Sequence, residues 1–201
     1  MRPSDRLRIL SGSPSGCGES DKTAAPRIAD FARGDAVREF LRDGRQVEIR
    51  ALRPDDRAEL LAAIGRVSAE SLYRRFFGVK RNFTDKEIVF FLNVDFVNHV
   101  ALVAVIEEGG RPTIVGGGRY VVVRPGTAEL AFAVLDQYQG LSIGVVLIRH
   151  LIEIARAAGL AHLIADVLPS NTPMLKVFER SGVPFGTRRE SESVHVSLIL
   201  K

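Results

Sequence analysis

Six consecutive residues, Gln139-Gly140-Leu141-Ser142-Ile143-Gly144, have the types and spacing of an anion-binding loop. They stand between a strand-like apolar run, 128–135, and a long run with helical periodicity, 145–158. A loop of small residues that opens a helix directs unpaired backbone N–H groups outward at the positive end of the helix dipole. Glycine lets an anion approach this backbone closely because it has no Cβ. The loop therefore favours a phosphate or pyrophosphate, although a plain strand-to-helix turn has the same composition.

The run that precedes the loop carries one acidic residue, Glu129, with small apolar residues around it. Burial among such neighbours is expected to raise the pKa of the Glu129 carboxyl toward values that suit a general base. A carboxylate that faces solvent, or that pairs with a basic neighbour, would fit the same position. Glu129 is thus the candidate base, with these alternatives open.

Other reactive groups are sparse. The four histidines are scattered, and no spacing of His, Cys, Asp and Glu is typical of a metal site, so no metal is expected. The single cysteine, Cys17, lies in a polar stretch and allows no disulfide within the chain. Asn171 precedes a helix-like segment and is a favoured N-cap residue.

Composition narrows the class of protein. The 201 residues, 46% hydrophobic and 26% charged, suffice for one domain with a sizeable core. The net charge of +4 is spread along the chain without interleaved aromatic residues, so binding to nucleic acid is not expected. No apolar run approaches the ~18 residues of a membrane span, and no signal-peptide pattern is present. We expect a cytoplasmic protein that does not contact membranes.

The elements that would position these residues begin near Val37. Residues 1–36 have little periodic hydrophobicity and are expected to be a disordered or loosely attached tail, so that deleting 1–33 leaves folding intact. Residues 37–201 form the domain. Asp43-Gly44 predicts the turn of a hairpin over 38–50. Further strands are predicted over these ranges: 99–106, 113–123, 128–135, 162–168, 183–189 and 193–200.

Helices are predicted at 54–64, after the cap Ser68, after the capping box at Thr84, at 145–158 and at 171–180. The glycine triplet 116–118 inside a strand indicates a bulge or a close approach by another backbone or a ligand, or a flat spot beneath a helix. The order of elements predicts an α+β fold, a mixed sheet flanked by helices.

The stretch 136–144 resembles motif A of the GNAT superfamily of N-acetyltransferases, (Gln/Arg)-x-x-Gly-x-(Gly/Ala), with Ser142 in place of the middle Gly. The resemblance covers roughly 37–201 and is closest to the GNAT domain of bacterial Pat-type protein lysine acetyltransferases. It implies a mostly antiparallel, twisted sheet of about seven strands. Supporting segments outside motif A are Leu41-Arg42-Asp43-Gly44-Arg45, Ile49-Arg50-Ala51-Leu52-Arg53-Pro54-Asp55-Asp56, Ser68-Ala69-Glu70-Ser71-Leu72-Tyr73-Arg74-Arg75-Phe76-Phe77 and Ala128-Glu129-Leu130-Ala131-Phe132.

The resemblance implies acetyl-CoA as co-substrate, no metal, and Glu129 as catalytic base. Its implied cofactor-binding residues are Val134, Leu135, Gln139, Gly140, Leu141, Ser142, Ile143, Gly144, Asn171 and Phe178. The roles of Val134 and Leu135 belong to the backbone, which would meet pantetheine and the thioester oxygen. Many relatives have Tyr, a general acid, where this chain has Phe178. Ser142 adds a Cβ near the expected phosphate, together with a hydroxyl that can donate to it.

The implied acceptor is an exposed protein lysine, plausibly on an AMP-forming acyl-CoA synthetase. A small amine or a protein N-terminus, and a non-catalytic acyl-CoA-binding regulatory module, are the alternatives. The basic residues Arg74, Arg75, Lys80 and Arg81 are most often a solvated face. In the resembling arrangement they border the acceptor groove and favour an acidic protein surface near the target lysine.

Overall fold

The computed structural model describes residue 31 and residues 35–78 and 82–201. The predictions for residues 1–30 and 32–34, which include Cys17, and for Lys80 and Arg81 lie outside the described residues. None of the helices in the described ranges is long and apolar enough to cross a membrane.

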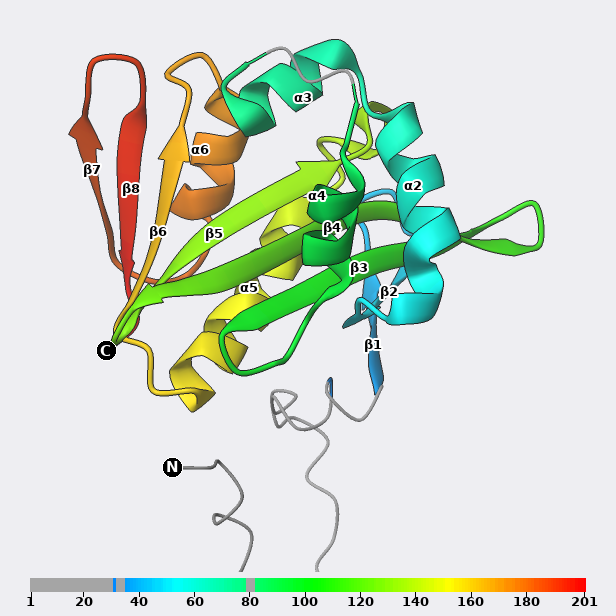
Figure 1. Ribbon diagram of the computed structural model, residues 1–201, viewed down its shortest axis with the longest axis horizontal. Helices are drawn as coiled ribbons and strands as arrows, with labels where there is room; N and C mark the ends of the chain where they lie inside the picture. The colour runs from blue at the N-terminus through cyan, green and yellow to red at the C-terminus, as the bar shows by residue number, and fades with distance from the viewer. Residues whose placement is uncertain (1–30, 32–34, 79–81) are drawn as a thin grey trace, which may run out of the picture.

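Eight strands form one sheet in the order β1-β2-β3-β4-β5-β6-β8-β7 (Figure 1). The strands are β1 Ala36–Phe40, β2 Gln46–Ala51, β3 His99–Glu108, β4 Arg111–Arg124, β5 Thr127–Val134, β6 His162–Val167, β7 Phe185–Arg189 and β8 Val194–Ile199. Every neighbouring pair is antiparallel except β5 and β6. The prediction of a mixed, mostly antiparallel sheet is confirmed, with eight strands rather than about seven, because both terminal hairpins join the sheet at its edges.

Helices cover both faces of this sheet. They are the short η1 Pro54–Asp56 and η2 Asp136–Tyr138, and the longer α2 Arg57–Arg66, α3 Ala69–Phe76, α4 Asp85–Leu92, α5 Ile143–Ala157 and α6 Thr172–Glu179. In Figure 1, α2, α3 and α4 lie on the viewer's side of the sheet and α5 lies behind it. The predicted α+β layering is therefore confirmed.

Local sequence signals account for the element boundaries. Gly44 has φ of 83° at the tip of the β1–β2 hairpin, where Gly is the residue that adopts this conformation freely. The Ser68 hydroxyl accepts a hydrogen bond from the Ser71 N–H and caps α3. Thr84 and Glu87 form the reciprocal capping box that opens α4. These three predictions are confirmed.

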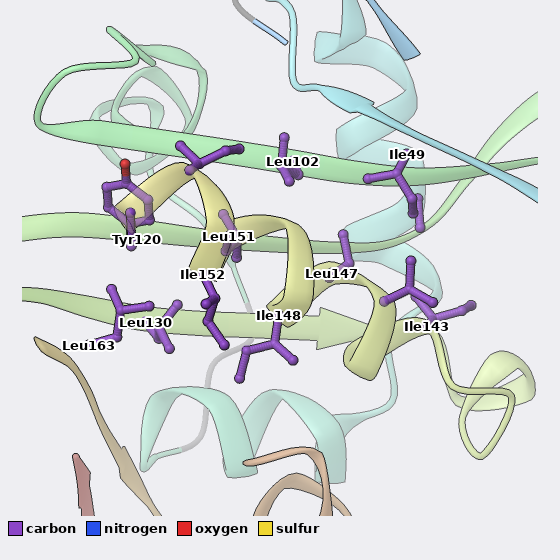
Figure 2. Packing of buried hydrophobic residues seen from close by; sticks show 14 of the residues in the cluster. Ile49, Leu102, Tyr120, Leu130, Ile143, Leu147, Ile148, Leu151, Ile152 and Leu163 are labelled. Carbon is purple, nitrogen blue, oxygen red and sulfur yellow. The ribbon is translucent and has the colours of Figure 1, made fainter. Parts of the chain in front are cut away.

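The main hydrophobic core lies between the sheet and α5. Leu147, Ile148 and Leu151 of this helix are fully buried against strand residues such as Leu102 and Leu130 (Figure 2). A smaller cluster on the opposite face joins α2 to β3 and includes Ala101 and Val103. Alternate residues of the central strands thus serve two cores, as the two-residue period of a strand requires.

The glycine triplet on β4 combines two of the predicted alternatives. The pairing of β3 with β4 shifts register between Ala104 and Val105, which marks a bulge opposite the start of the triplet. A Cβ on Gly118 would lie 2.7 Å from Cε1 of Phe132 and 3.1 Å from Cδ1 of Leu151. A Cβ on Gly116 would lie 3.1 Å from Cγ2 of Ile143. Glycine here lets α5 pack directly on the strand.

Phe31 departs from the expected behaviour of the N-terminal segment. Its side chain is 1% exposed, within the main core cluster. The ring meets the His150 ring edge to face, with centroids 5.7 Å apart. His150 in turn contacts Glu39 of β1, with Nε2 and Oε1 3.1 Å apart. A deletion of residues 1–33 would remove this core residue.

We therefore expect Phe31→Ala to lower the free energy of unfolding by about 3–5 kcal/mol, the cost of truncating a buried Phe in a packed core. Urea titration followed by circular dichroism measures this. Phe40→Ala is the matched control, because the Phe40 side chain is 71% exposed. Equal stability of the two variants would show that Phe31 contributes no core packing.

Candidate active site

The sheet forks between β5 and β6. These parallel strands are paired at Thr127, Ala128 and Glu129, which lie opposite His162, Leu163 and Ile164. Beyond this point β5 continues beside β4, and β6 continues beside β8. Figure 1 shows the two strands diverging toward their carboxyl ends. Glu129 therefore stands at the base of the fork, and the loop 139–144 follows the open end of β5.

A cavity of about 600 Å³ occupies the open part of the fork. Its lining joins the loop after β5 to the start of α6 on one side, and to α2, α3 and α4 on the other. Predicted residues that line it are Val134, Leu135, Gln139, Gly140, Ser142, Ile143, Gly144, Asn171 and Phe178. Glu129 and Leu141 are not among its lining residues. A cavity of this size, lined from both sides of the sheet, is suited to two reactants that meet within the fork.

The loop has the geometry that its composition predicts. Gly140 and Ser142 have φ of 78° and 77°, the left-handed conformation. Ser142 is the residue that caps α5, and its hydroxyl makes no capping hydrogen bond. The family pattern has Gly at this position because Gly adopts positive φ without strain. Ser142 keeps the conformation at a cost of about 1–3 kcal/mol, with its hydroxyl available for another partner.

Ile143 and Gly144, the first residues of α5, serve packing as well as the loop. The Ile143 side chain is 1% exposed and belongs to the core, so only its backbone would be available to an anion at the loop. A Cβ on Gly144 would lie 3.0 Å from Cγ2 of Val177. Gly144 therefore lets α5 and α6 approach closely, which is a structural reason for Gly that is independent of any ligand.

A polar network that the sequence did not predict fixes α3 to the loop. The Asp136 carboxylate accepts hydrogen bonds from the Ser68 N–H at 2.9 Å, the Ser68 hydroxyl at 2.7 Å and the Ser71 hydroxyl at 2.8 Å. Burial alone would raise the pKa of Asp136, but these bonds hold it below its usual value. The Gln139 amide donates to the Ser71 hydroxyl at 3.1 Å. The N-terminus of α3 is thereby anchored at the mouth of the cavity.

Val134, the last residue of β5, and Leu135, the residue after it, differ in which backbone groups a ligand could reach. The Leu135 N–H donates to the Val115 carbonyl at 2.9 Å and is not open to a ligand. The Val134 carbonyl accepts from the Gln139 amide at 3.2 Å. The predicted backbone contact to pantetheine thus depends on Val134, because displacement of the Gln139 side chain would free the Val134 carbonyl.

Asn171 and Phe178 belong to α6. The Asn171 carboxamide oxygen accepts from the Met174 N–H at 3.3 Å, which confirms the N-cap. Phe178 is 1% exposed and lies in the main core. Its ring supplies packing beside the cavity and has no hydroxyl to donate.

Glu129 is exposed, and the expectation that it is buried is wrong. The pairing of β5 with β6 ends at Glu129, so β5 has an open edge from this residue onward. Glu129 interacts electrostatically with Arg75 of α3. Burial lowers the pKa of Arg75, and the negative charge of Glu129 acts in the opposite direction. Glu129 therefore lies on the face of the sheet that carries α3 and α4.

A second arginine, Arg119 of β4, lines the same cavity. Its Nη1 lies 3.2 Å from Nε2 of His99 and 3.4 Å from the Phe91 carbonyl oxygen. Its guanidinium stacks over the Phe91 ring at 4.6 Å. Burial, with the nearby charge of Arg75, lowers the pKa of Arg119 to about 10. Its signal in the sequence is an Arg between Gly118 and Tyr120 within an otherwise apolar stretch, which does not by itself predict a site residue.

Comparisons with known proteins agree with this architecture. The model of the acetyltransferase (GNAT) family matches residues 66–183. Acetyltransferase PA5475 of Pseudomonas aeruginosa is 35% identical over 153 residues, 75% of this chain and 82% of that protein. Acetyltransferase Pat of Mycolicibacterium smegmatis is 33% identical over 165 residues, 80% of this chain. These residues are 47% of that protein, so the chain spans about half its length.

Among solved structures, the GNAT domain of S. lividans PAT superposes with a TM-score of 0.73 at 32% identity, covering 81% of this chain and 95% of that domain. The chain belongs to the GNAT family of acetyltransferases. Within this family it is similar to the GNAT domains of Pat proteins. Acetyl-CoA is the acetyl donor of the family.

The loop can be tested for pyrophosphate binding by charge alone. Asp and Asn both tolerate the positive φ of residue 142 better than most side chains. Ser142→Asp places a carboxylate at the expected pyrophosphate position, and Ser142→Asn places a neutral group of nearly the same shape there. We expect the Asp variant to bind acetyl-CoA about tenfold more weakly than the Asn variant, because two negative charges at close range repel.

Isothermal titration calorimetry measures both affinities, with melting temperatures as the control for folding. Substitution of Gly144 is less informative, because a side chain there would also press on Val177. Equal dissociation constants for the two Ser142 variants would contradict this placement of the pyrophosphate.

Proposed function

We propose that this protein transfers acetyl from acetyl-CoA to the ε-amine of a protein lysine, with AMP-forming acyl-CoA synthetases as the substrate class. The observation that carries the proposal is the single cavity that joins the loop of α5 to the face bearing Glu129. Its lining comes from both sides of the sheet, and this supports an arrangement in which the two reactants meet at the fork. The similarity to Pat acetyltransferases supports lysine as the acceptor.

In the proposed arrangement, N–H groups at the start of α5 hold the pyrophosphate, and the pantetheine arm follows the end of β5. The acceptor amine attacks the thioester carbonyl carbon directly, forming the C–N bond as the C–S bond breaks. Glu129 accepts the amine proton, directly or through one water, since a lysine with a pKa of about 10.4 is mostly protonated at neutral pH. The thiolate leaves without a phenol, because residue 178 is Phe.

The exposure of Glu129 is consistent with an acceptor that arrives from outside on a large surface. An open carboxylate can receive a proton through water until the acceptor covers it. Closing of the groove by the bound acceptor would then remove this water and strengthen the local electrostatics.

The test is incubation with acetyl-CoA and purified AMP-forming acyl-CoA synthetases, with mass spectrometry to locate acetylated lysines. Short peptides and small amines such as spermidine are run in parallel. Enzyme-dependent acetylation of a defined lysine is the expected result. Turnover of small amines alone would assign a metabolite acceptor. Binding of acetyl-CoA without turnover of any acceptor would favour a non-catalytic acyl-CoA-binding module.

A further inference from the structure

Two guanidinium groups share the face of the sheet on which Glu129 lies. Arg119 is paired with Ala131 across β4 and β5, and Glu129 is two residues from Ala131 on the same strand. Arg119 and Glu129 therefore point to one face as diagonal neighbours, a separation of about 7–8 Å between backbones. Arg75 reaches this face from α3, where it interacts electrostatically with both groups. The cluster thus carries two positive charges and one negative charge.

The hydrogen-bond partners of Arg119 are neutral. Nδ1 of His99 lies 2.9 Å from the Asn93 carbonyl oxygen and must donate to it, so Nε2 is the acceptor for Arg119. Burial and the charge of Arg119 both lower the pKa of His99, which keeps the imidazole neutral. The remaining close partners are the Phe91 carbonyl and its ring. Across residues 35–78 and 82–201, no carboxylate lies within ion-pair distance of Arg119.

Other arginines of this fold show what Arg119 lacks. Arg50, whose side chain is 12% exposed, makes two parallel bonds of 2.6 and 2.7 Å to the Asp56 carboxylate. Arg74, next to Arg75 on α3, pairs with Glu70. A guanidinium has five N–H donors in a planar fork that matches a carboxylate. Arg119 lines the cavity, and in the described part of the chain no carboxylate forms an ion pair with it.

We propose that Arg119, assisted by Arg75, binds a carboxylate carried by the acceptor beside its reacting amine. This rests on the proposed function, since it assigns the acceptor as a lysine with an acidic side chain near it. The carboxylate would pair with the guanidinium fork, while the amine lies toward Glu129 on the neighbouring strand. Without such a carboxylate, the two arginines would repel the positive charge of an approaching lysine.

The test compares two peptides of equal length in which the target lysine is flanked by Glu or by the isosteric, neutral Gln. For the wild-type protein, kcat/KM is expected to be at least tenfold higher with the Glu peptide, the range of a charge-assisted hydrogen bond. Arg119→Gln should reduce this ratio to near one, and Arg119→Lys should retain part of it. The control is Arg124→Gln, an exposed arginine on the same strand that does not line the cavity.

The readout is a ratio between peptides, so it separates recognition from packing. A wild-type ratio near one would overturn the proposal while leaving lysine acetylation intact. An equal loss on both peptides in Arg119→Gln would also overturn it, assigning Arg119 a structural role. A parallel experiment uses the Gln peptide with succinyl-CoA in place of acetyl-CoA. If the protein prefers succinyl-CoA and Arg119→Gln abolishes this preference, Arg119 binds a carboxylate of the donor. That result would overturn the proposal of an acidic acceptor. Absence of acetylation of either peptide or any protein would instead count against the proposed function.

Discussion

Glu129→Gln is expected to lower kcat by ~10²–10⁴ at neutral pH, with the affinity for acetyl-CoA nearly unchanged. The substitution keeps the size of the side chain and removes its basicity. In the proposed arrangement Glu129 acts on the acceptor amine, and the loop 139–144 and the end of β5 hold the donor, so donor binding should not depend on Glu129. Raising the pH should restore part of the rate, because the acceptor amine then loses its proton without a base.

Steady-state kinetics from about pH 7 to pH 10, with calorimetry for acetyl-CoA, measure both effects. Glu192→Gln, a change of the same kind at an exposed position in the β7–β8 turn, is the control. Turnover by Glu129→Gln at the rate of the wild-type protein would place the base elsewhere or assign the proton to water alone.

Phe178→Ala is expected to lower the free energy of unfolding by about 3–5 kcal/mol, because its ring is buried in the main core and truncation leaves a cavity. Phe178→Tyr, in contrast, nearly conserves volume and should change kcat only modestly. The added hydroxyl must find a hydrogen-bond partner at the cavity wall.

Chemical denaturation and steady-state kinetics of the two variants separate packing from proton donation. A large gain in kcat for Phe178→Tyr at unchanged stability would show that the wild-type site lacks a proton donor for the departing thiolate. That result would also give new weight to the interpretation of this chain as a non-catalytic module.

Local chemistry in the sequence predicted most of the fold. The capping box at Thr84, the cap at Ser68 and the turn at Gly44 are short-range signals, and each lies where the structure begins or ends an element. The loop 139–144 was predicted for the same reason, since its conformation is set by small residues and by the helix that follows. Periodicity identified α5, which has more buried residues than any other helix in the described part of the chain.

What the sequence did not predict depends on partners far apart along the chain. The exposure of Glu129 follows from where β6 stops pairing with β5, and local composition does not encode this register. The bond of Asp136 to Ser68 spans 68 residues, and the setting of Arg119 combines β3, β4 and α4. Phe31 was assigned to a tail because its neighbours lack periodicity, although its own side chain is buried.

The fork has a mechanical consequence. Because β5 and β6 share three paired positions, the sheet behaves as two panels, β1–β5 and β6–β8, joined at a narrow seam and braced by α5. In the proposed arrangement, a donor bound between the two panels would restrict their motion relative to each other. Amide hydrogens on β6 and β8 should therefore exchange more slowly when the donor is bound. This is expected even though, in the proposed arrangement, the donor contacts mainly the end of β5 and the start of α5.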